Sequence, residues 1–169
     1  MKAIVNVSSN WGIGCNNQLL TFLPEDMKFF KEKTTGNVVV MGRLTFESLP
    51  GRRPLKDRVN IVITKTKDYD ANGAIVCNSI EEVAREIEKY TDRDIYIIGG
   101  ASIYKKFLPY CDEVYVTKNS SDIEADAFFE NLDEDEKFKV VDESEIKEDK
   151  GIEYKFVLYK NKKVENIQY

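Results

Sequence analysis

The 169-residue sequence contains no histidine. This absence excludes nucleophile pairs of serine or cysteine with histidine, histidine general bases and the common histidine metal sites. Any proton transfer must therefore use carboxylates, tyrosines, lysines or water. The three cysteines, Cys15, Cys77 and Cys111, are widely spaced and form no CxxC pair, so we expect neither a disulfide framework nor a bound metal.

Long apolar runs and basic tracts are missing as well. The apolar stretch over residues 1–7 is too short for a signal peptide or a membrane span, so we expect a cytoplasmic protein with no membrane partner. A net charge of -5, without a basic tract interleaved with aromatic residues, argues against nucleic acid as a partner. The length and the 42% of hydrophobic residues fit a single globular domain over residues 1–169.

Strand-like and helical patterns alternate along most of the chain. Strands are predicted over residues 2–8, 38–41, 59–64, 94–98 and 114–117, and helices over residues 24–34, 43–49, 79–90 and 101–108. Two alternating runs, residues 138–141 and 154–159, are expected to pair as a hairpin. The pattern predicts an α/β fold, a single domain with a central mixed, mostly parallel sheet flanked by helices and a C-terminal antiparallel hairpin.

Two turns have the composition of phosphate-binding corners, because each runs from a buried strand through glycine into a helix start. Glycine lets a ligand approach the backbone, and the helix start offers free N–H groups. Gly99-Gly100 alone is also compatible with a simple tight turn, since it is not the GxGxxG fingerprint. The second corner, at Gly42, adds Arg43 and Thr45, which suit phosphate. Two such corners suggest a dinucleotide with a pyrophosphate.

Asp26 is an acid among apolar neighbours at the start of a predicted helix, where it shares a face with Met27 and Phe30. A carboxylate surrounded by apolar groups loses hydration, so its pKa rises and it can exchange protons near neutrality or pair with a cationic ring edge. The alternative is an acid that interacts with the helix macrodipole, as we expect for Glu25. The local pattern leaves both interpretations open.

Taken together, these segments resemble the dihydrofolate reductase family over nearly the whole chain. The similarity covers residues 4–14, 23–30, 40–48, 58–60, 97–104 and 114–117, in the order of the family. The resemblance implies NADPH-dependent reduction of 7,8-dihydrofolate to 5,6,7,8-tetrahydrofolate, by hydride transfer to C6 and protonation at N5. It also implies a monomeric enzyme of one-carbon metabolism and tetrahydrofolate biosynthesis that is an antifolate target.

The resemblance implies catalytic roles for Asp26, Thr117 and Thr21. Asp26 would bind the 2-amino and N3 edge of the pterin, Thr117 would complete that network, and the Thr21 hydroxyl would hold a water. Arg58 would bind the α-carboxylate of the glutamate tail, unless it is simply a solvated arginine. The implied substrate site, whose apolar members are also compatible with plain core packing, comprises Ile4, Val5, Asp26, Met27, Phe30, Leu49, Arg58, Ile98 and Thr117.

A cofactor site for NADPH is implied in the same way. Arg43, Thr64 and Lys65 would surround the 2′-phosphate, which is why NADPH rather than NADH is expected. The implied cofactor site comprises Asn6, Ile13, Asn17, Leu19, Gly42, Arg43, Leu44, Thr45, Thr64, Lys65, Ile98, Gly99, Gly100, Ala101, Ser102, Ile103 and Tyr104.

The chain departs from the family pattern at two places. Leu20-Thr21 stands where the family usually has Pro-Trp, and Asn6 replaces a small apolar residue, which would place an amide near the nicotinamide carboxamide. A wider, wetter site should weaken electrostatic control, so we expect activity with an altered rate or inhibitor fit. Asp126 matches the family's acidic residue that supports the active-site loop, or is a simple turn acid.

Two alternative functions stay open at this point. One is the related pyrimidine reductase of riboflavin synthesis, which resembles this fold and also uses NADPH. Arg58 and the pair of Asp26 and Phe30 favour a folate substrate instead. The other alternative is a non-catalytic module that binds folate or a nucleotide.

Overall fold

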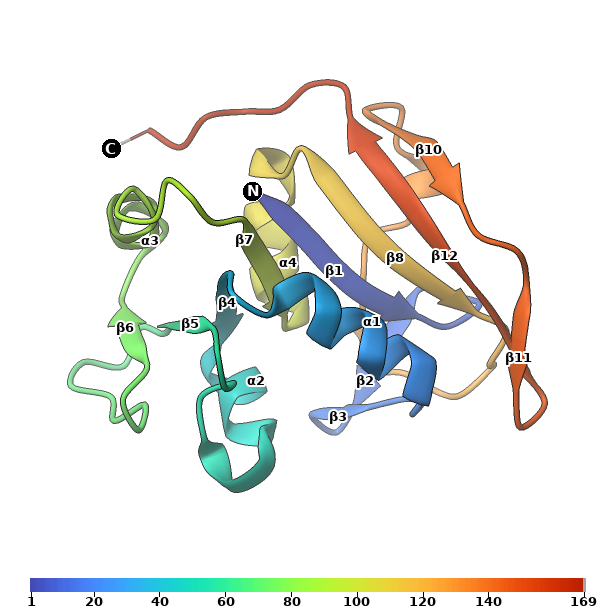
Figure 1. Cartoon of the computed structure of the whole chain (residues 1–169), viewed down its shortest axis with the longest axis horizontal. Helices are drawn as coiled ribbons and strands as arrows, with labels where there is room; N and C mark the ends of the chain where they lie inside the picture. The colour runs from blue at the N-terminus through green and yellow to red at the C-terminus, as the bar shows by residue number, and fades with distance from the viewer. Residues whose placement is uncertain (169) are drawn as a thin grey trace.

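The computed structural model describes residues 1–168 and places most strands in one large sheet (Figure 1). The strands of this sheet are β1 (Lys2–Val7), β4 (Val38–Gly42), β5 (Val59–Ile63), β6 (Ile75–Cys77), β7 (Ile95–Gly99), β8 (Glu113–Asn119), β10 (Phe138–Glu143), β11 (Lys147–Asp149) and β12 (Ile152–Asn161). Their order is β10-β12-β8-β1-β7-β4-β5-β6, and β11 pairs with β12. Neighbouring strands run parallel from β6 to β8, whereas β12 is antiparallel to both β8 and β10.

Helices cover both faces of the sheet, with α1 in front and α4 behind in Figure 1. The helices are α1 (Pro24–Thr34), α2 (Arg43–Ser48), α3 (Ile80–Ile87) and α4 (Ala101–Phe107), with 3-10 turns η1 (Pro50–Arg52), η2 (Leu108–Tyr110) and η3 (Leu132–Glu134). Pro24 begins α1, where its fixed φ suits a helix and its missing N–H costs no bond. Ser79 caps α3 by accepting a hydrogen bond from the Glu82 backbone N–H.

Alternation along the strands produces two hydrophobic cores, one on each face of the sheet. In β4, Val38 and Val40 join a cluster with Phe107 of α4, whereas Val39 and Met41 join a cluster with Phe46 of α2. Successive strand side chains point to opposite faces, so this division follows from the register of the sheet. The aromatic residues of α1 pack on the second cluster. The same alternation decides which strand residues face α1.

Two polar residues, Asn6 and Thr117, face α1 from the middle of the sheet. In β1, Ile4 belongs to the cluster on the α1 side, and Asn6 follows it two residues later. Asn6 is the register partner of Thr117 in the parallel pair of β1 and β8. Both side chains therefore lie on one face near the carboxyl ends of adjacent strands, where α/β sheets usually bind ligands.

A second, small antiparallel sheet contains β2 (Gly12–Cys15), β3 (Gln18–Leu19) and β9 (Ala127–Phe128), in the order β3-β2-β9. The strand β2 lies outside the strands predicted from the sequence. Its partner β9 is distant in sequence and gave no strand pattern. Asp126, beside β9, accepts a hydrogen bond from the Asn16 backbone N–H at 2.9 Å, which confirms that it supports this segment.

The predicted fold class is confirmed, a mixed sheet with helices on its faces. The expected hairpin is also confirmed, since β10 pairs with β12 in antiparallel register. Its second strand is longer than predicted, and it also pairs with β8. This second pairing joins the hairpin to the parallel part of the sheet.

Candidate active site

The carboxylate of Asp26 lies where α1 meets the carboxyl ends of β1 and β8. The Thr117 hydroxyl donates a hydrogen bond to Asp26 Oδ1 at 2.6 Å. The Asn6 amide nitrogen donates one to Asp26 Oδ2 at 3.0 Å. Each carboxylate oxygen thus has one donor from the protein and retains a lone pair for a ligand. The expected contact between Thr117 and Asp26 is confirmed.

The electrostatic environment of Asp26 differs from that of the neighbouring acid. Loss of hydration in its half-buried position raises the pKa of Asp26, and the hydrogen bonds from Thr117 and Asn6 oppose that rise. Glu25 is exposed, and its pKa is lowered by a hydrogen bond from Tyr154 and by Lys147. In the part of the chain that the structure describes, no cation forms an ion pair with Asp26. The pKa direction expected for a carboxylate among apolar groups is confirmed.

A cleft of about 1100 Å³ lies next to this carboxylate. Asn6 and Met27, which flank Asp26, belong to its wall. Its lining residues are Val5, Asn6, Ile13, Gly14, Asn17, Gln18, Leu19, Met27, Gly42, Arg43, Leu44, Thr45, Ser48, Leu49, Pro50, Ile63, Thr64, Lys65, Asn78, Ser79, Ile80, Glu81, Ile98, Gly99, Gly100, Ala101, Ser102, Ile103, Tyr104, Lys106 and Ala127. The cleft therefore brings together every residue of the expected cofactor site, together with part of the expected substrate site.

The two glycine corners lie side by side in the wall of the cleft. A Cβ atom on Gly42 would lie 2.9 Å from Ile103 Cγ1 and 3.9 Å from the Gly100 backbone nitrogen. Thr45 Oγ1 would lie 3.3 Å from a Cβ atom on Gly99 or on Gly100. The Gly99–Gly100 peptide bond is cis. Side chains at these glycine positions would fill the space between the cleft and the N-terminal ends of α2 and α4.

The walls of the cleft combine exposed apolar side chains with few charges. Leu19, Met27 and Leu44 line it and remain 72%, 41% and 49% exposed. Tyr104 is buried behind them and donates its hydroxyl to the Ile4 carbonyl oxygen at 2.7 Å. Exposed apolar surface of this kind suits flat rings, because the rings remove it from water when they bind.

Six expected site residues do not line the cleft itself, namely Ile4, Thr21, Asp26, Phe30, Arg58 and Thr117. Ile4 is buried in the core, and Phe30 packs against the same cluster. Thr21 lies with its hydroxyl 3.5 Å from the Asn6 amide nitrogen. Asp26 and Thr117 lie just behind Asn6 and Met27. Only Arg58 belongs to a different part of the surface.

Arg58 is held by neutral oxygens and has no carboxylate partner. Its Nε donates to the Lys56 carbonyl oxygen at 2.8 Å, and its Nη1 donates to Thr34 Oγ1 at 3.1 Å. Burial lowers the pKa of Arg58, and the nearby Asp57 opposes that change. Among residues 1–168, no acid forms an ion pair with this guanidinium, although it remains fully charged at neutral pH. The free N–H groups of Arg58 are thus available to an anion.

Arg43, in contrast, already has a carboxylate partner. Its Nη1 contacts both oxygens of Glu47, at 3.1 and 3.2 Å. The Tyr69 hydroxyl also donates to Glu47, at 2.9 Å, and this bond lowers the pKa of Glu47. The arginine expected to bind phosphate at this corner is therefore oriented by Glu47, in the next turn of its own helix. The i to i+4 spacing of Arg43 and Glu47 was the available sequence signal.

Other lining residues had no functional signal in the sequence. The start of α3, from Asn78 to Glu81, reaches the cleft beside Thr64 and Lys65. The helical pattern over residues 79–90 predicted this helix but not its position, which depends on the parallel pairing of β5 with β6. Asn78 Nδ2 donates to the Thr64 carbonyl oxygen at 2.7 Å and joins the two segments.

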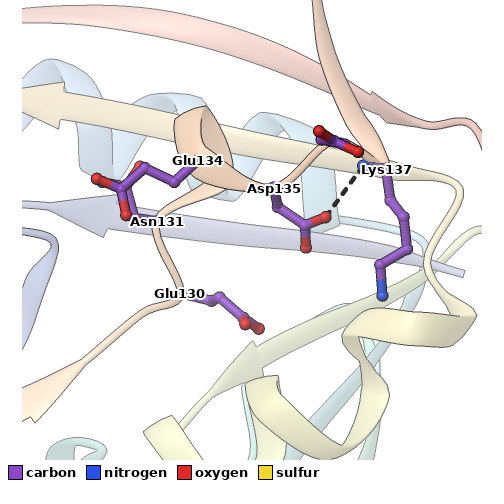
Figure 2. Close-up of a pocket in the computed structure, with 6 residues that line it drawn as sticks. Glu130, Asn131, Glu134, Asp135 and Lys137 are labelled. Carbon is purple, nitrogen blue, oxygen red and sulfur yellow. Dashed lines mark hydrogen bonds between the residues drawn. The ribbon is translucent and has the colours of Figure 1, made fainter.

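A smaller hollow of about 480 Å³ lies near η3, away from the cleft (Figure 2). Its lining residues are Glu130, Asn131, Glu134, Asp135, Glu136 and Lys137. Asp135 Oδ1 accepts a hydrogen bond from the Lys137 backbone N–H at 3.0 Å, and the labelled carboxylates do not converge on one point (Figure 2). Within residues 1–168, no group of three or more acidic, cysteine or histidine residues is arranged to hold a metal ion.

The fold and the cleft together define an α/β enzyme that binds a nucleotide at the carboxyl edge of a parallel sheet. The family model described as dihydrofolate reductase matches residues 1–163. The chain belongs to the dihydrofolate reductase family. No helix among the described residues is long and apolar enough to cross a lipid bilayer.

Relatives match this chain over almost their full length. The dihydrofolate reductase of Bacillus subtilis (strain 168) is 36% identical over 160 residues, which cover 94% of this chain and 93% of that protein. The enzyme of Rattus norvegicus is 36% identical over 183 residues, covering 96% and 97%. A solved structure, dihydrofolate reductase from Enterococcus faecalis complexed with NADP(H) and RAB-propyl, has a TM-score of 0.84 at 35% identity and covers 95% of both chains.

The raised pKa of Asp26 predicts a cost in stability that Asp26→Asn removes. When folding raises the pKa of an acid, the protein loses stability as pH rises. The loss begins at the pKa of the unfolded state, about 3.9 for an aspartate, and continues through the pKa of the folded state. We therefore expect Asp26→Asn to be more stable than the wild type at pH 7, with a gain that shrinks as pH falls toward about 4. An asparagine keeps both contacts when its oxygen faces Asn6 and its nitrogen donates to the Thr117 hydroxyl.

Urea denaturation of both proteins across this pH range measures the difference. Glu25→Gln is the matched control, because Glu25 lies one residue away and its pKa is lowered rather than raised. It should give no gain at pH 7. A free energy of unfolding for Asp26→Asn equal to or below that of the wild type at pH 7 would contradict the assignment.

Proposed function

We propose that the cleft and the Asp26 carboxylate form the active site of this chain. The chain is an NADPH-dependent oxidoreductase that reduces 7,8-dihydrofolate to 5,6,7,8-tetrahydrofolate. The single observation that carries the site assignment is the half-buried Asp26, which receives donors on both oxygens beside a nucleotide-sized cleft. The match of the dihydrofolate reductase family model over residues 1–163 favours folate over the pyrimidine substrate of riboflavin synthesis.

The glycine corners and the walls of the cleft hold the cofactor. The backbone at Gly42 and Gly100 receives no side-chain cap, so the N–H groups at both helix starts are available to the pyrophosphate. Arg43, Thr64 and Lys65 all line the cleft and suit the 2′-phosphate. NADPH, when bound, supplies the hydride that is transferred to C6 of dihydrofolate.

Asp26 binds and orients the pterin. Its carboxylate retains one lone pair on each oxygen, and these accept the 2-amino and N3 hydrogens of the ring. This pairing fixes the ring in the plane of the carboxylate and leaves C6 and N5 toward the cleft. Asp26 also favours protonation of N5 through a water, for which the Thr21 hydroxyl beside Asn6 provides a partner. The reaction consumes one hydride and one proton.

Arg58 binds the glutamate tail of the substrate. Its guanidinium is oriented by Lys56 and Thr34 and has no acid partner of its own. A carboxylate that reaches it forms a charge-assisted, bidentate pair. The apolar substrate residues that line the cleft, among them Met27 and Leu49, cover the rings.

We further propose that the enzyme acts as a monomer in the cytoplasm and binds no nucleic acid. The net charge of -5 and the absence of a basic tract support this proposal. Size-exclusion chromatography with light scattering tests the oligomeric state.

Asp26→Asn should slow dihydrofolate reduction at neutral pH by about 10²–10⁴-fold, the usual contribution of a positioned proton donor or acceptor. The rate should recover partly in acid, where solvent protonates the pterin without the carboxylate. The rate is measured from the loss of NADPH absorbance in a single turnover with dihydrofolate. Glu25→Gln is the control and should retain turnover. Full turnover of a folded Asp26→Asn variant at neutral pH would remove Asp26 from the active site.

Arg58→Leu should weaken dihydrofolate binding more than it slows hydride transfer, because the tail is bound far from the reacting carbon. We expect KM to rise by about 10-fold or more, as the loss of a charge-assisted pair predicts. Arg93→Leu, which removes an exposed arginine elsewhere, is the control. An unchanged KM together with a collapse of the chemical step would show that Arg58 is not the tail anchor.

Arg43→Ala combined with Lys65→Ala should narrow the preference for NADPH over NADH, because both cations line the cleft and are assigned to the 2′-phosphate. Steady-state kinetics with each cofactor measure the ratio of kcat/KM values. Lys67→Ala, an exposed lysine two residues further on, should leave the ratio unchanged. An undiminished preference in the double variant would rule this assignment out.

A further inference from the structure

Asn6 places an amide against the catalytic carboxylate, at a position where the family pattern has a small apolar residue. Its nitrogen donates to Asp26 Oδ2 at 3.0 Å and lies 3.5 Å from the Thr21 hydroxyl. Its oxygen accepts a hydrogen bond from Asn119 Nδ2 at 2.7 Å. The amide is thus bonded at both ends within the protein.

The orientation of the Asn6 amide follows from the backbone N–H of Ser121, which is linked to Asn6 through Asn119. The Ser121 backbone N–H, which can only donate, bonds to Asn119 Oδ1 at 2.9 Å. The Ser121 hydroxyl contacts the same oxygen. Asn119 must therefore turn its nitrogen toward Asn6, and Asn6 in turn must present its nitrogen to Asp26. Both Asn119 and Ser121 are buried, which holds this order of donors in place.

We propose that Asn6 is a positioning residue for the Asp26 carboxylate, and that Asn119 and Ser121 hold its amide with an N–H toward that carboxylate. The inference rests on the proposed function, since it assigns Asn6 an effect through the residue that binds the pterin. Together with Thr117, Asn6 fixes the carboxylate plane before a ligand arrives. The lone pairs left on the two oxygens then face the cleft in a fixed direction.

Among residues 1–168, Asn6 and Thr117 are the side chains that donate hydrogen bonds to the Asp26 carboxylate, so its charge depends on them. Tyr104 from α4 and Tyr154 from β12 interact electrostatically with Asp26, and Glu25 is its neighbour on α1. Burial raises the pKa of Tyr104, and the bond to Glu25 raises the pKa of Tyr154 to about 12, so both stay neutral. Glu25 is an anion paired with Tyr154 and Lys147. Asn6 and Thr117 therefore oppose the desolvation of the carboxylate.

The expected contact of Asn6 with the nicotinamide carboxamide is a competing role for the same side chain. Its oxygen and one of its N–H groups are already used by Asn119 and Asp26. One N–H group is left, on the side of Thr21. The two roles predict different effects of Asn6→Ala. If Asn6 positions the carboxylate, the titration of Asp26 should change; if Asn6 contacts the nicotinamide, the binding of NADPH should change.

The test is a ¹³C NMR titration of aspartate side-chain carboxyl carbons in the ligand-free protein. The Asp26 resonance is identified by its loss in Asp26→Asn. Asn6→Ala should raise the midpoint of this resonance by about one pH unit, as expected for one hydrogen bond to a charged group. Asn119→Ala, which frees the Asn6 amide to turn, should raise it by less. Asn161→Ala removes a buried asparagine whose side chain bonds the remote Cys111 carbonyl oxygen and Lys163 backbone N–H, and should leave the Asp26 midpoint unchanged.

A second readout is the pH dependence of hydride transfer. The reaction takes up one proton, so its rate falls above an apparent pKa. That apparent pKa should rise most in Asn6→Ala, less in Asn119→Ala and not at all in Asn161→Ala. The dissociation constant of NADPH should stay unchanged in Asn6→Ala. An unmoved midpoint in folded Asn6→Ala, or in Asn119→Ala if Asn6→Ala does not fold, would overturn the proposal. A shifted midpoint in a protein that does not reduce dihydrofolate would support the positioning role while refuting the proposed function.

Discussion

The parallel register of β1 with β8 is the constraint on which the proposed active site depends. It sets Asn6 beside Thr117 on one face of the sheet, and α1 then brings Asp26 over both. A slip of β1 by one residue against β8 would turn Asn6 to the opposite face, into a core of apolar residues. The carboxylate would then lose one of its two donors while remaining poorly hydrated, which is costly for a charged group.

The protein tolerates this carboxylate because its charge is neither fully buried nor fully hydrated. The pKa of Asp26 is raised by the loss of water, yet two neutral donors limit the rise without adding a competing cation. A lysine or arginine at the position of Asn6 would neutralise the charge that the pterin edge needs. Neutral donors instead fix the geometry and leave the charge available to the ligand. This arrangement trades folding stability for a carboxylate whose pKa is raised and whose remaining lone pairs are open to N–H donors.

Much of the fold could be predicted, because its main elements are long and have regular patterns. Buried strands such as residues 38–41 stand between clear turn signals, and Pro24 marks the start of α1. The small sheet of β2, β3 and β9 could not be found in this way, because its strands are too short to show alternation. They exist because segments more than 100 residues apart meet, as in the bond from Asn16 to Asp126.

The site was predictable at its glycine corners and at Asp26, where the residue type itself is unusual for its position. It was not predictable where a side chain has a partner from another strand. Asn6 was expected near the nicotinamide because its place on the first strand was known, whereas its bonds to Asp26 and Asn119 depend on the sheet register. Arg43 was a different case, since Glu47 lies one helical turn away and could have been recognised as its partner.

The separation in sequence of the groups around Asp26 has a consequence for folding. Thr117 lies 91 residues from Asp26, and Asn119 lies 113 residues from Asn6. Closing loops of this length costs chain entropy before the contacts can form, so such contacts tend to form late. The chain therefore acquires a ligand-binding carboxylate only when β1, β8 and α1 have all docked. In refolding, recovery of pterin binding should thus follow the recovery of helix, and it marks the moment at which the middle of the sheet is complete.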